Sequence, residues 1–265
     1  MFEILDYLFF QRALIILLTA SIVAGTIGPF IVAKRISMIS GSISHGAFGG
    51  LGIAHYFGFS PIFGALCFSI LGAGMISHIS QKHKNYLDSM LTIFWAGGMA
   101  IGLIFVFITT GYATNLFSFL FGNVLLNSAN DLYIIIGVTT FIVTSVIIIY
   151  KTLIATLFNE EFAQLRGVST SAVFFFFLLL VALAIVVLIK TMGVVLTLAI
   201  LTISPAIAIR YLKKLHQIIF VSIILNIITA ISGLFLAYFI NLPTAPVIIL
   251  LQTILFLVSL FLKKR

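Results

Sequence analysis

The sequence predicts an all-α protein, a polytopic bundle of about eight or nine membrane-spanning helices with one short helix on the cytoplasmic side. Of its 265 residues, 62% are hydrophobic and only 8% are charged, whereas soluble domains keep about a quarter of their residues charged. The apolar residues form repeated runs of about 20, long enough as helices to cross a bilayer core of roughly 30 Å. Most lysines and arginines stand at the ends of these runs.

Nine runs qualify as spans. Each is expected to be helical, because backbone groups that face lipid must be paired within their own segment. In chain order the runs are Ala13–Val32, Ile36–Tyr56, Pro61–Ser80, Met90–Thr110, Leu132–Tyr150, Ala172–Ile189, Val194–Ile209, Ile218–Ile240 and Ala245–Leu262. The second run is rich in glycine, so a count of eight, with this run short or re-entrant, stays open. We expect residues 1–265 to form a single transmembrane domain.

The basic residues orient the spans. Those placed at cytoplasmic ends are Lys34, Lys82, Lys151, Lys213 and Lys263. This arrangement alternates correctly through nine spans and follows the positive-inside rule, with Arg12 and Lys190 as its two exceptions. It predicts an outer N-terminus and a cytoplasmic C-terminus. The net charge of +8 does not indicate nucleic-acid binding, because the basic residues share no face with interleaved aromatics.

The motifs argue against an enzyme. No stretch matches the phosphate-binding G-x-x-x-x-G-K-[ST] pattern, so ATP hydrolysis by a P-loop is excluded. Ser42, Ser44 and His45 lie close together, as in a serine hydrolase. Neighbours on one helix point in different directions, however, and no G-x-S-x-G elbow accompanies them.

The stretch SGSISHGAFGGLG (Ser40–Gly52) is the most unusual part of any span. Its glycines, such as Gly46 and Gly50, have a structural explanation, since small residues four apart let helices pack closely in lipid. His45 is different, because ionisable groups within spans usually face a bundle interior or a water path, and neutral imidazole is a common metal ligand. A functional histidine and a hydrogen-bonded packing histidine both remain open.

A second unusual stretch, Thr156–Thr170, faces the cytoplasm. Phe158, Phe162 and Leu165 follow one another at spacings of four and three, which predicts a short amphipathic helix. Asn159 is a suitable N-cap and Gly167 a suitable residue to end the helix. Amphipathicity and caps together favour a docking surface over a plain loop.

Six motifs in order resemble the integral membrane permease of the zinc/manganese/iron ABC importers, over nearly the whole chain. They lie in Gly28–Gly50, Leu87–Phe105, Leu120–Leu125, Asn159–Val168, Met192–Leu212 and Ser232–Leu250. The resemblance implies a permease for zinc or manganese, and iron next, in a prokaryotic cell membrane. It also implies three partners: a second permease copy, a cytoplasmic ABC ATPase that uses the ATP, and an extracellular or periplasmic metal-binding protein.

The same resemblance assigns roles to residues. His45 is expected to contact the metal in transit, and the pathway lining is Gly41, Ser42, Ser44 and Gly49. The coupling segment, at about residues 153–170, would dock the ATPase through Asn159, Glu161, Ala163 and Gly167. No cofactor other than the transported ion is implied for this chain.

One position departs from the family pattern. Many members carry an aspartate four residues before the histidine, on the same helical turn, where this chain has Gly41. Three interpretations stay open: the site uses the His45 of a second subunit, it holds the ion loosely with backbone carbonyls, or the cargo differs from zinc and manganese.

Two other functions are alternatives for a chain of this kind. A permease for a metal chelate, such as a siderophore or cobalamin, would need a wider pathway. A secondary carrier driven by an ion gradient would favour paired acidic groups within spans. All six acidic residues lie at or beyond the predicted span ends, which argues against the carrier.

Overall fold

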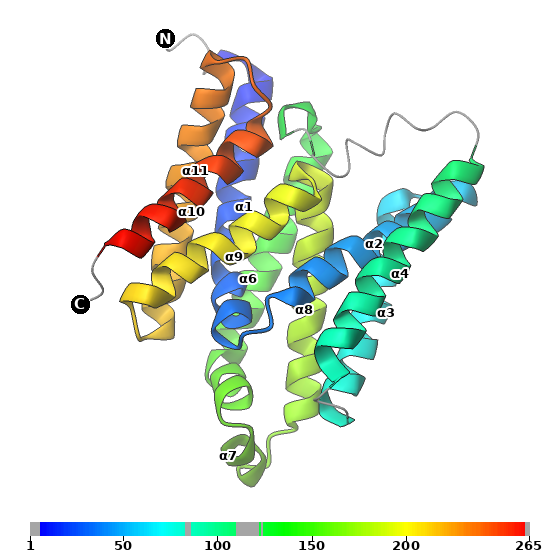
Figure 1. The fold of residues 1–265 in the computed structure, drawn as a ribbon, viewed down its shortest axis with the longest axis vertical. Coiled ribbons are helices and arrows are strands. Elements are labelled where there is room, and N and C mark those ends of the chain that lie inside the picture. Colours follow the sequence, from blue (N-terminus) through cyan, green and yellow to red (C-terminus); the bar gives the residue numbers. More distant parts are fainter. Residues whose placement is uncertain (1–5, 83–85, 110–121, 123, 263–265) are drawn as a thin grey trace. The chain divides into compact units, whose positions relative to one another are not determined.

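The computed structural model describes residues 6–82, 86–109, 122 and 124–262, and every regular element within those ranges is a helix (Figure 1). The long helices are α1 (Leu8–Ala33), α2 (Met38–Tyr56), α3 (Pro61–Lys82), α4 (Leu87–Ile108), α6 (Ala129–Phe158), α8 (Thr170–Met192), α9 (Val194–Tyr211), α10 (Leu215–Phe239) and α11 (Thr244–Phe261). Two short helices, η3 (Val124–Leu126) and α7 (Glu160–Leu165), complete the described elements. The all-α prediction is confirmed.

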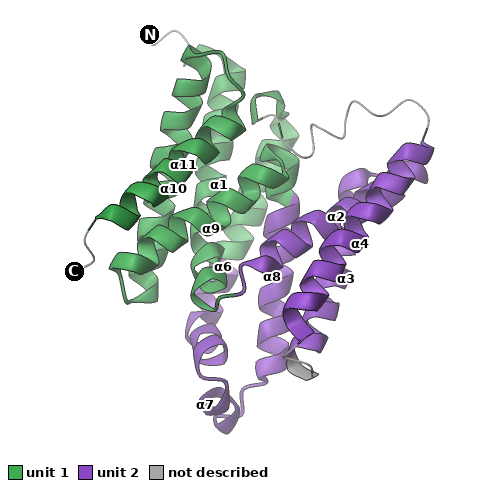
Figure 2. Ribbon diagram, in the orientation of Figure 1, with its two compact units in different colours: residues 1–35, 117–143, 187–265 green, residues 36–116, 144–186 purple. Residues whose placement is uncertain are grey.

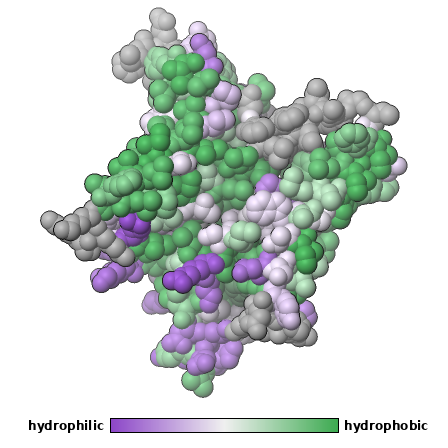
Figure 3. Space-filling view, viewed as in Figure 1, coloured by the Kyte–Doolittle hydropathy of each residue, from purple (hydrophilic) through white to green (hydrophobic). Residues whose placement is uncertain are grey.

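Eight of these helices are long and apolar enough to cross a membrane. The remaining long helix is α2, the glycine-rich run. Fourteen of its 19 residues are buried, so most of α2 does not meet lipid and needs no apolar surface. By contrast, α4 exposes large apolar side chains such as Phe107, which is 91% exposed. Apolar residues cover much of the visible surface (Figure 3), as expected where lipid is the solvent.

The helices extend beyond the predicted apolar runs. The fifth run, predicted to end at Tyr150, belongs to α6, which continues through Lys151 to Phe158. Hydropathy marks where the membrane ends, but a lysine does not stop a helix. The helix ends where Asn159 caps the next one. The predicted coupling segment therefore comprises the last turns of α6, all of α7 and the start of α8.

The chain divides into two compact units (Figure 2). Unit 1 contains residues 1–35, 117–143 and 187–265, and unit 2 contains residues 36–116 and 144–186. In unit 1, α1 packs on α9 and α10, and α9, α10 and α11 pack on one another. In unit 2, α2 packs on both α3 and α4.

In unit 2, α2 is held against α3 and α4 by backbone contact at glycines. A Cβ added to Gly50 would lie 2.1 Å from the carbonyl oxygen of Gly64 in α3, and one added to Gly98 of α4 would lie 2.5 Å from Gly46 Cα. The small face predicted for Gly46 and Gly50 thus serves two neighbours, with Gly46 against α4 and Gly50 against α3. No side chain fits between these backbones, which explains the glycines of α2.

In unit 1, buried amides join α9, α10 and α11. Gln252 of α11 donates from Nε2 to Asn226 Oδ1 (3.0 Å) and Thr229 Oγ1 (3.1 Å) of α10. Asn226 in turn donates from Nδ2 to the carbonyl oxygen of Ile200 in α9, at 3.1 Å. These three side chains are at most 2% exposed. Such hydrogen bonds join helices where apolar contact alone gives no preference over lipid.

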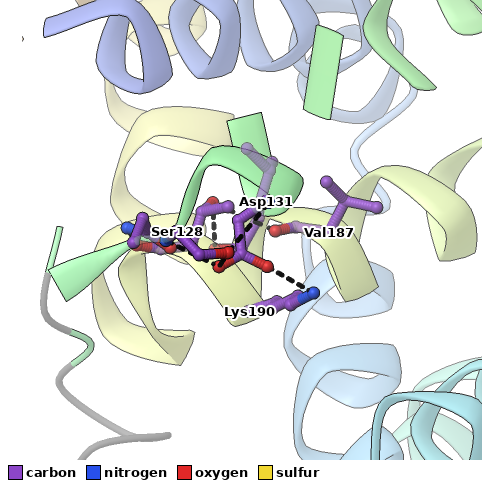
Figure 4. A network of polar contacts seen from close by, with 7 residues as sticks. Ser128, Asp131, Val187 and Lys190 are labelled. Atoms are coloured by element: carbon purple, nitrogen blue, oxygen red, sulfur yellow. Dashed lines mark hydrogen bonds and ion pairs between the residues drawn. The ribbon is translucent and has the colours of Figure 1, made fainter. Parts of the chain in front are cut away.

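Lys190, an exception to the orientation rule, is neutralised by Asp131. Its Nζ lies 2.5 Å from Asp131 Oδ1, and both side chains are largely buried (Figure 4). Asp131 also accepts hydrogen bonds at Oδ2 from the backbone N–H (2.9 Å) and the hydroxyl (2.7 Å) of Ser128. Ser128 and Asp131 form a capping box at the start of α6. One carboxylate thereby caps α6 and removes the net charge of the lysine near the end of α8.

Adjacent glycines of α4 provide a test of the backbone contact. Gly98→Ala should lower the melting temperature in detergent, since overpacking at Gly46 costs about 1–3 kcal/mol. Gly97 has nothing within 4 Å of an added Cβ. Gly97→Ala should leave the melting temperature unchanged or raise it, because alanine favours helix by about 1 kcal/mol. Equal melting temperatures for the two variants would contradict close packing of α2 on α4.

The pair between Lys190 and Asp131 is tested by a double-mutant cycle. Asp131→Asn should destabilise the protein by about 1–3 kcal/mol, because it leaves a largely buried cation without its partner. Adding Lys190→Gln should restore most of the lost stability, measured as the melting temperature. Additive losses in the double variant would show that the two side chains act independently.

Candidate functional site

The polar face of α2 lies against α4. Ser42, which is fully buried, donates from Oγ to the carbonyl oxygen of Leu91 at 2.7 Å. A Cβ added to Gly49 would lie 2.8 Å from the carbonyl oxygen of Gly98. Both residues are therefore engaged by the backbone of α4. Among the predicted lining residues, they contribute chiefly to helix contact.

His45 and Ser44 differ from these two residues. Ser44 is buried and its Oγ has no hydrogen-bond partner among the described residues. The His45 ring is partly buried. Its Nδ1 is buried and has no hydrogen-bond partner among the residues that the structure describes. A buried polar atom left unpaired costs about 1–3 kcal/mol. The sequence thus places two adjacent unused polar groups on α2.

Trp95 of α4 stacks on His45. The ring centroids are 4.4 Å apart and the ring planes differ by only 7°. The same indole covers position 41, where an added Cβ would lie 2.9 Å from Trp95 Cζ3. With Trp95 in this position, a larger side chain at position 41 would require the indole to shift.

Sequence reasoning missed Trp95. It stands 50 positions from His45, and the pairing depends on how α2 and α4 align. The available signal was a lone tryptophan beside the glycines of FWAGG (Phe94–Gly98), where small residues already predicted a close helix contact.

Within one chain the site offers a single strong metal ligand. No group of three or more His, Cys, Asp or Glu side chains that could hold a metal ion exists among the described residues. Imidazole binds divalent transition metals through an in-plane nitrogen lone pair. With one imidazole, the site in a single chain can make only a weak contact with a metal cation.

The predicted coupling segment contains the short capped helix that its sequence predicts. The backbone N–H of Phe162 donates to Asn159 Oδ1 at 3.2 Å, which caps the start of α7. Gly167 has a φ of 75° and donates from its N–H to the carbonyl oxygen of Gln164 at 2.9 Å, while Val168 donates to that of Ala163 at 3.0 Å. This pair of bonds is the Schellman motif, which requires the left-handed conformation that glycine adopts without strain.

The faces of α7 have different characters. Ala163 is 1% exposed and lies on the inner face. Leu165 is 87% exposed, Glu161 is also exposed, and the guanidinium of Arg166 lies 4.6 Å from the centre of the Phe162 ring. Ala163 therefore anchors α7, and Leu165 with Glu161 remains available to a partner. Leu165 was used in sequence reasoning only as part of the amphipathic pattern.

Comparison with known proteins places these features in a family. Residues 6–263 match the model of the ABC 3 transport family. The membrane protein slr2045 of Synechocystis is 33% identical over 98% of this chain and 92% of its own length. The manganese transport system membrane protein MntC of Listeria monocytogenes is 30% identical over 99% of this chain and 96% of its own length.

The solved structure of PsaBC from Streptococcus pneumoniae in complex with Fab has the same fold. It superimposes with a TM-score of 0.86 at 30% sequence identity, covering 97% of this chain and 92% of the matched chain. Because the family match and the relatives extend over essentially the whole chain, this protein belongs to the ABC 3 transport family.

Proposed function

We propose that this chain is the membrane-spanning permease subunit of an ATP-driven importer for a divalent transition metal ion, with manganese as the first candidate and zinc and iron next. The observation that carries the proposal is its full-length similarity to the manganese transport protein MntC. The chemistry of the α2 face agrees with such a cargo.

In this proposal His45 is the residue that contacts the metal in transit. Conduction requires binding that is weak enough for release. A single imidazole per subunit meets this requirement better than a closed set of ligands, and a second permease copy would supply a second imidazole. Ser44 is the best-placed polar neighbour, because its hydroxyl is unused. Gly41, Ser42 and Gly49 shape the path by letting α4 lie close to α2.

The partners follow from what the chain lacks and what it exposes. Its sequence contains no P-loop, so the ATP would be hydrolysed by a separate cytoplasmic ATPase, and the chain itself would not be an enzyme. That ATPase would dock on α7, and an outer binding protein would deliver the ion. The whole chain would act as one permease domain in a prokaryotic cell membrane, as a homodimer with the C-terminus in the cytoplasm and the N-terminus outside.

The first test is metal uptake by cells that carry the complete importer. His45→Ala should abolish or strongly reduce uptake of manganese, because the proposed path then loses the imidazole that contacts the metal. Assembly with the ATPase should be unaffected. Uptake of manganese, zinc and iron is measured in parallel with radioactive ions. Native uptake of all three metals by the assembled variant would remove His45 from the path.

A second test concerns the coupling helix. Leu165→Asp should prevent the ATPase from co-purifying with the permease, since it places a charge at the most exposed apolar position of α7. Leu126→Asp is the matched control, because Leu126 of η3 is 80% exposed but lies outside the coupling segment. Loss of the ATPase in the control, with retention in Leu165→Asp, would refute the docking role of α7.

A further inference from the structure

The packing of α4 on α2 and α3 determines where Trp95, the residue stacked on His45, lies. Phe94, the neighbour of Trp95, fills the space left by two glycines: a Cβ added to Gly46 of α2 would lie 2.1 Å from the Phe94 ring, and one added to Gly72 of α3 would lie 2.3 Å from it. Phe94 also stacks on Phe68 of α3, with ring centroids 5.5 Å apart. Phe94 thereby fixes the rotation of α4 about its own axis.

A hydrogen bond fixes α4 along its axis. Ser42 holds the carbonyl oxygen of Leu91, one turn before Trp95. The contacts of Gly46 and Gly49 with Gly98 do the same one turn after it. These contacts set both the rotation of α4 and its position along its axis. They therefore place the indole of Trp95 against Gly41 and His45 independently of the stacking between Trp95 and His45.

The stack leaves the chemistry of the imidazole intact. A metal or a hydrogen bond reaches histidine in the plane of the ring, through a nitrogen lone pair or N–H. Trp95 covers a face of the ring, since the two planes are almost parallel. It can therefore orient His45 without occupying either nitrogen. Aromatic stacking of this kind contributes about 0.5–1.5 kcal/mol beyond burial.

We propose that Trp95 is a positioning residue of the transit site: it holds the His45 ring in the orientation that meets the metal, and Gly41 leaves room for the indole in this position. This inference rests on the proposed function. A positioning role differs from ordinary aromatic packing in its consequence. Loss of the stack should impair metal transfer while the permease stays folded and coupled to its ATPase.

The experiment uses the reconstituted complex of permease and ATPase in proteoliposomes, supplied with saturating manganese-loaded binding protein. Trp95→Leu keeps an apolar side chain and removes the stack. It should lower the number of manganese ions moved per ATP hydrolysed by about threefold to tenfold, the range that corresponds to the loss of one stack, with ATP hydrolysis maintained. Trp95→Phe should retain most of the native ratio, because it keeps an aromatic face.

Two further variants separate positioning from folding. Gly41→Ala, which pushes the indole away, should lower the ratio as Trp95→Leu does, and the double variant should be no worse than either single one, since both act on one contact. Phe107→Leu is the matched control on the lipid-exposed side of α4 and should keep the native ratio.

Fluorescence gives a direct readout, because Trp95 is the only tryptophan of the chain. Its emission is obtained by subtracting the spectrum of the Trp95→Phe complex from that of the native complex. Manganese chloride should change this emission, and the change should disappear in His45→Ala. A metal response that survives in His45→Ala would overturn the proposal.

The outcomes also distinguish this inference from the proposed function. If the native complex transports manganese and both Trp95→Leu and Gly41→Ala transport it with the native ratio, the positioning role is wrong and the permease function stands. If the native complex moves none of the three metals, the proposed function fails and the inference falls with it.

Discussion

Direct contact between helix backbones in unit 2 is the constraint on which the rest of the site depends. Helix α2 meets α3 at Gly50 and Gly64, and meets α4 at Gly46 and Gly98. Apolar side chains gain nothing from helix association in lipid, so close approach of backbones is what stabilises the contact. Because the backbones touch, the side chains of α2 beside these contacts, His45 among them, have tightly determined surroundings.

The same constraint explains a composition that looks unfavourable for a membrane. Serines and a histidine lower the hydropathy of α2, yet most of the helix is covered by protein. Several polar groups within other long helices are paired with one another. The amides of Gln252 and Asn226 pair across α9, α10 and α11, and Lys190 pairs with Asp131. Ser44 Oγ and His45 Nδ1, on adjacent residues of α2, are among the buried polar atoms that have no hydrogen-bond partner in the described part of the chain.

The fold was largely predictable because its signals are local. Runs of apolar residues located the long helices, and the cap residues Asn159 and Gly167 located both ends of α7 through bonds that span only a few positions. The exact helix ends were not predictable from hydropathy, as the extension of α6 past Lys151 shows.

The candidate site was predictable only in part. His45 could be selected because an ionisable group within a span is unusual. The contact of Ser42 with Leu91, and that of His45 with Trp95, join residues about fifty positions apart and depend on the alignment of two helices. Reading α2 alone therefore could not show that Ser42 donates a hydrogen bond to α4 or that Gly41 lies against an indole, and the lining role of both residues stays a prediction.

Unit 2 contains both ends of the proposed mechanism. It includes α2, with His45, and α7 with the flanking parts of α6 and α8. Ala163 is buried while Leu165 is exposed, so in the proposed mechanism a partner that binds α7 acts on the same unit as His45, the proposed transit residue. A well-packed body transmits displacement because its interior is hardly compressible. The glycine contacts that bind α2 to α3 and α4 therefore do more than stabilise the fold: they hold His45, Trp95 and their helices in one closely packed group.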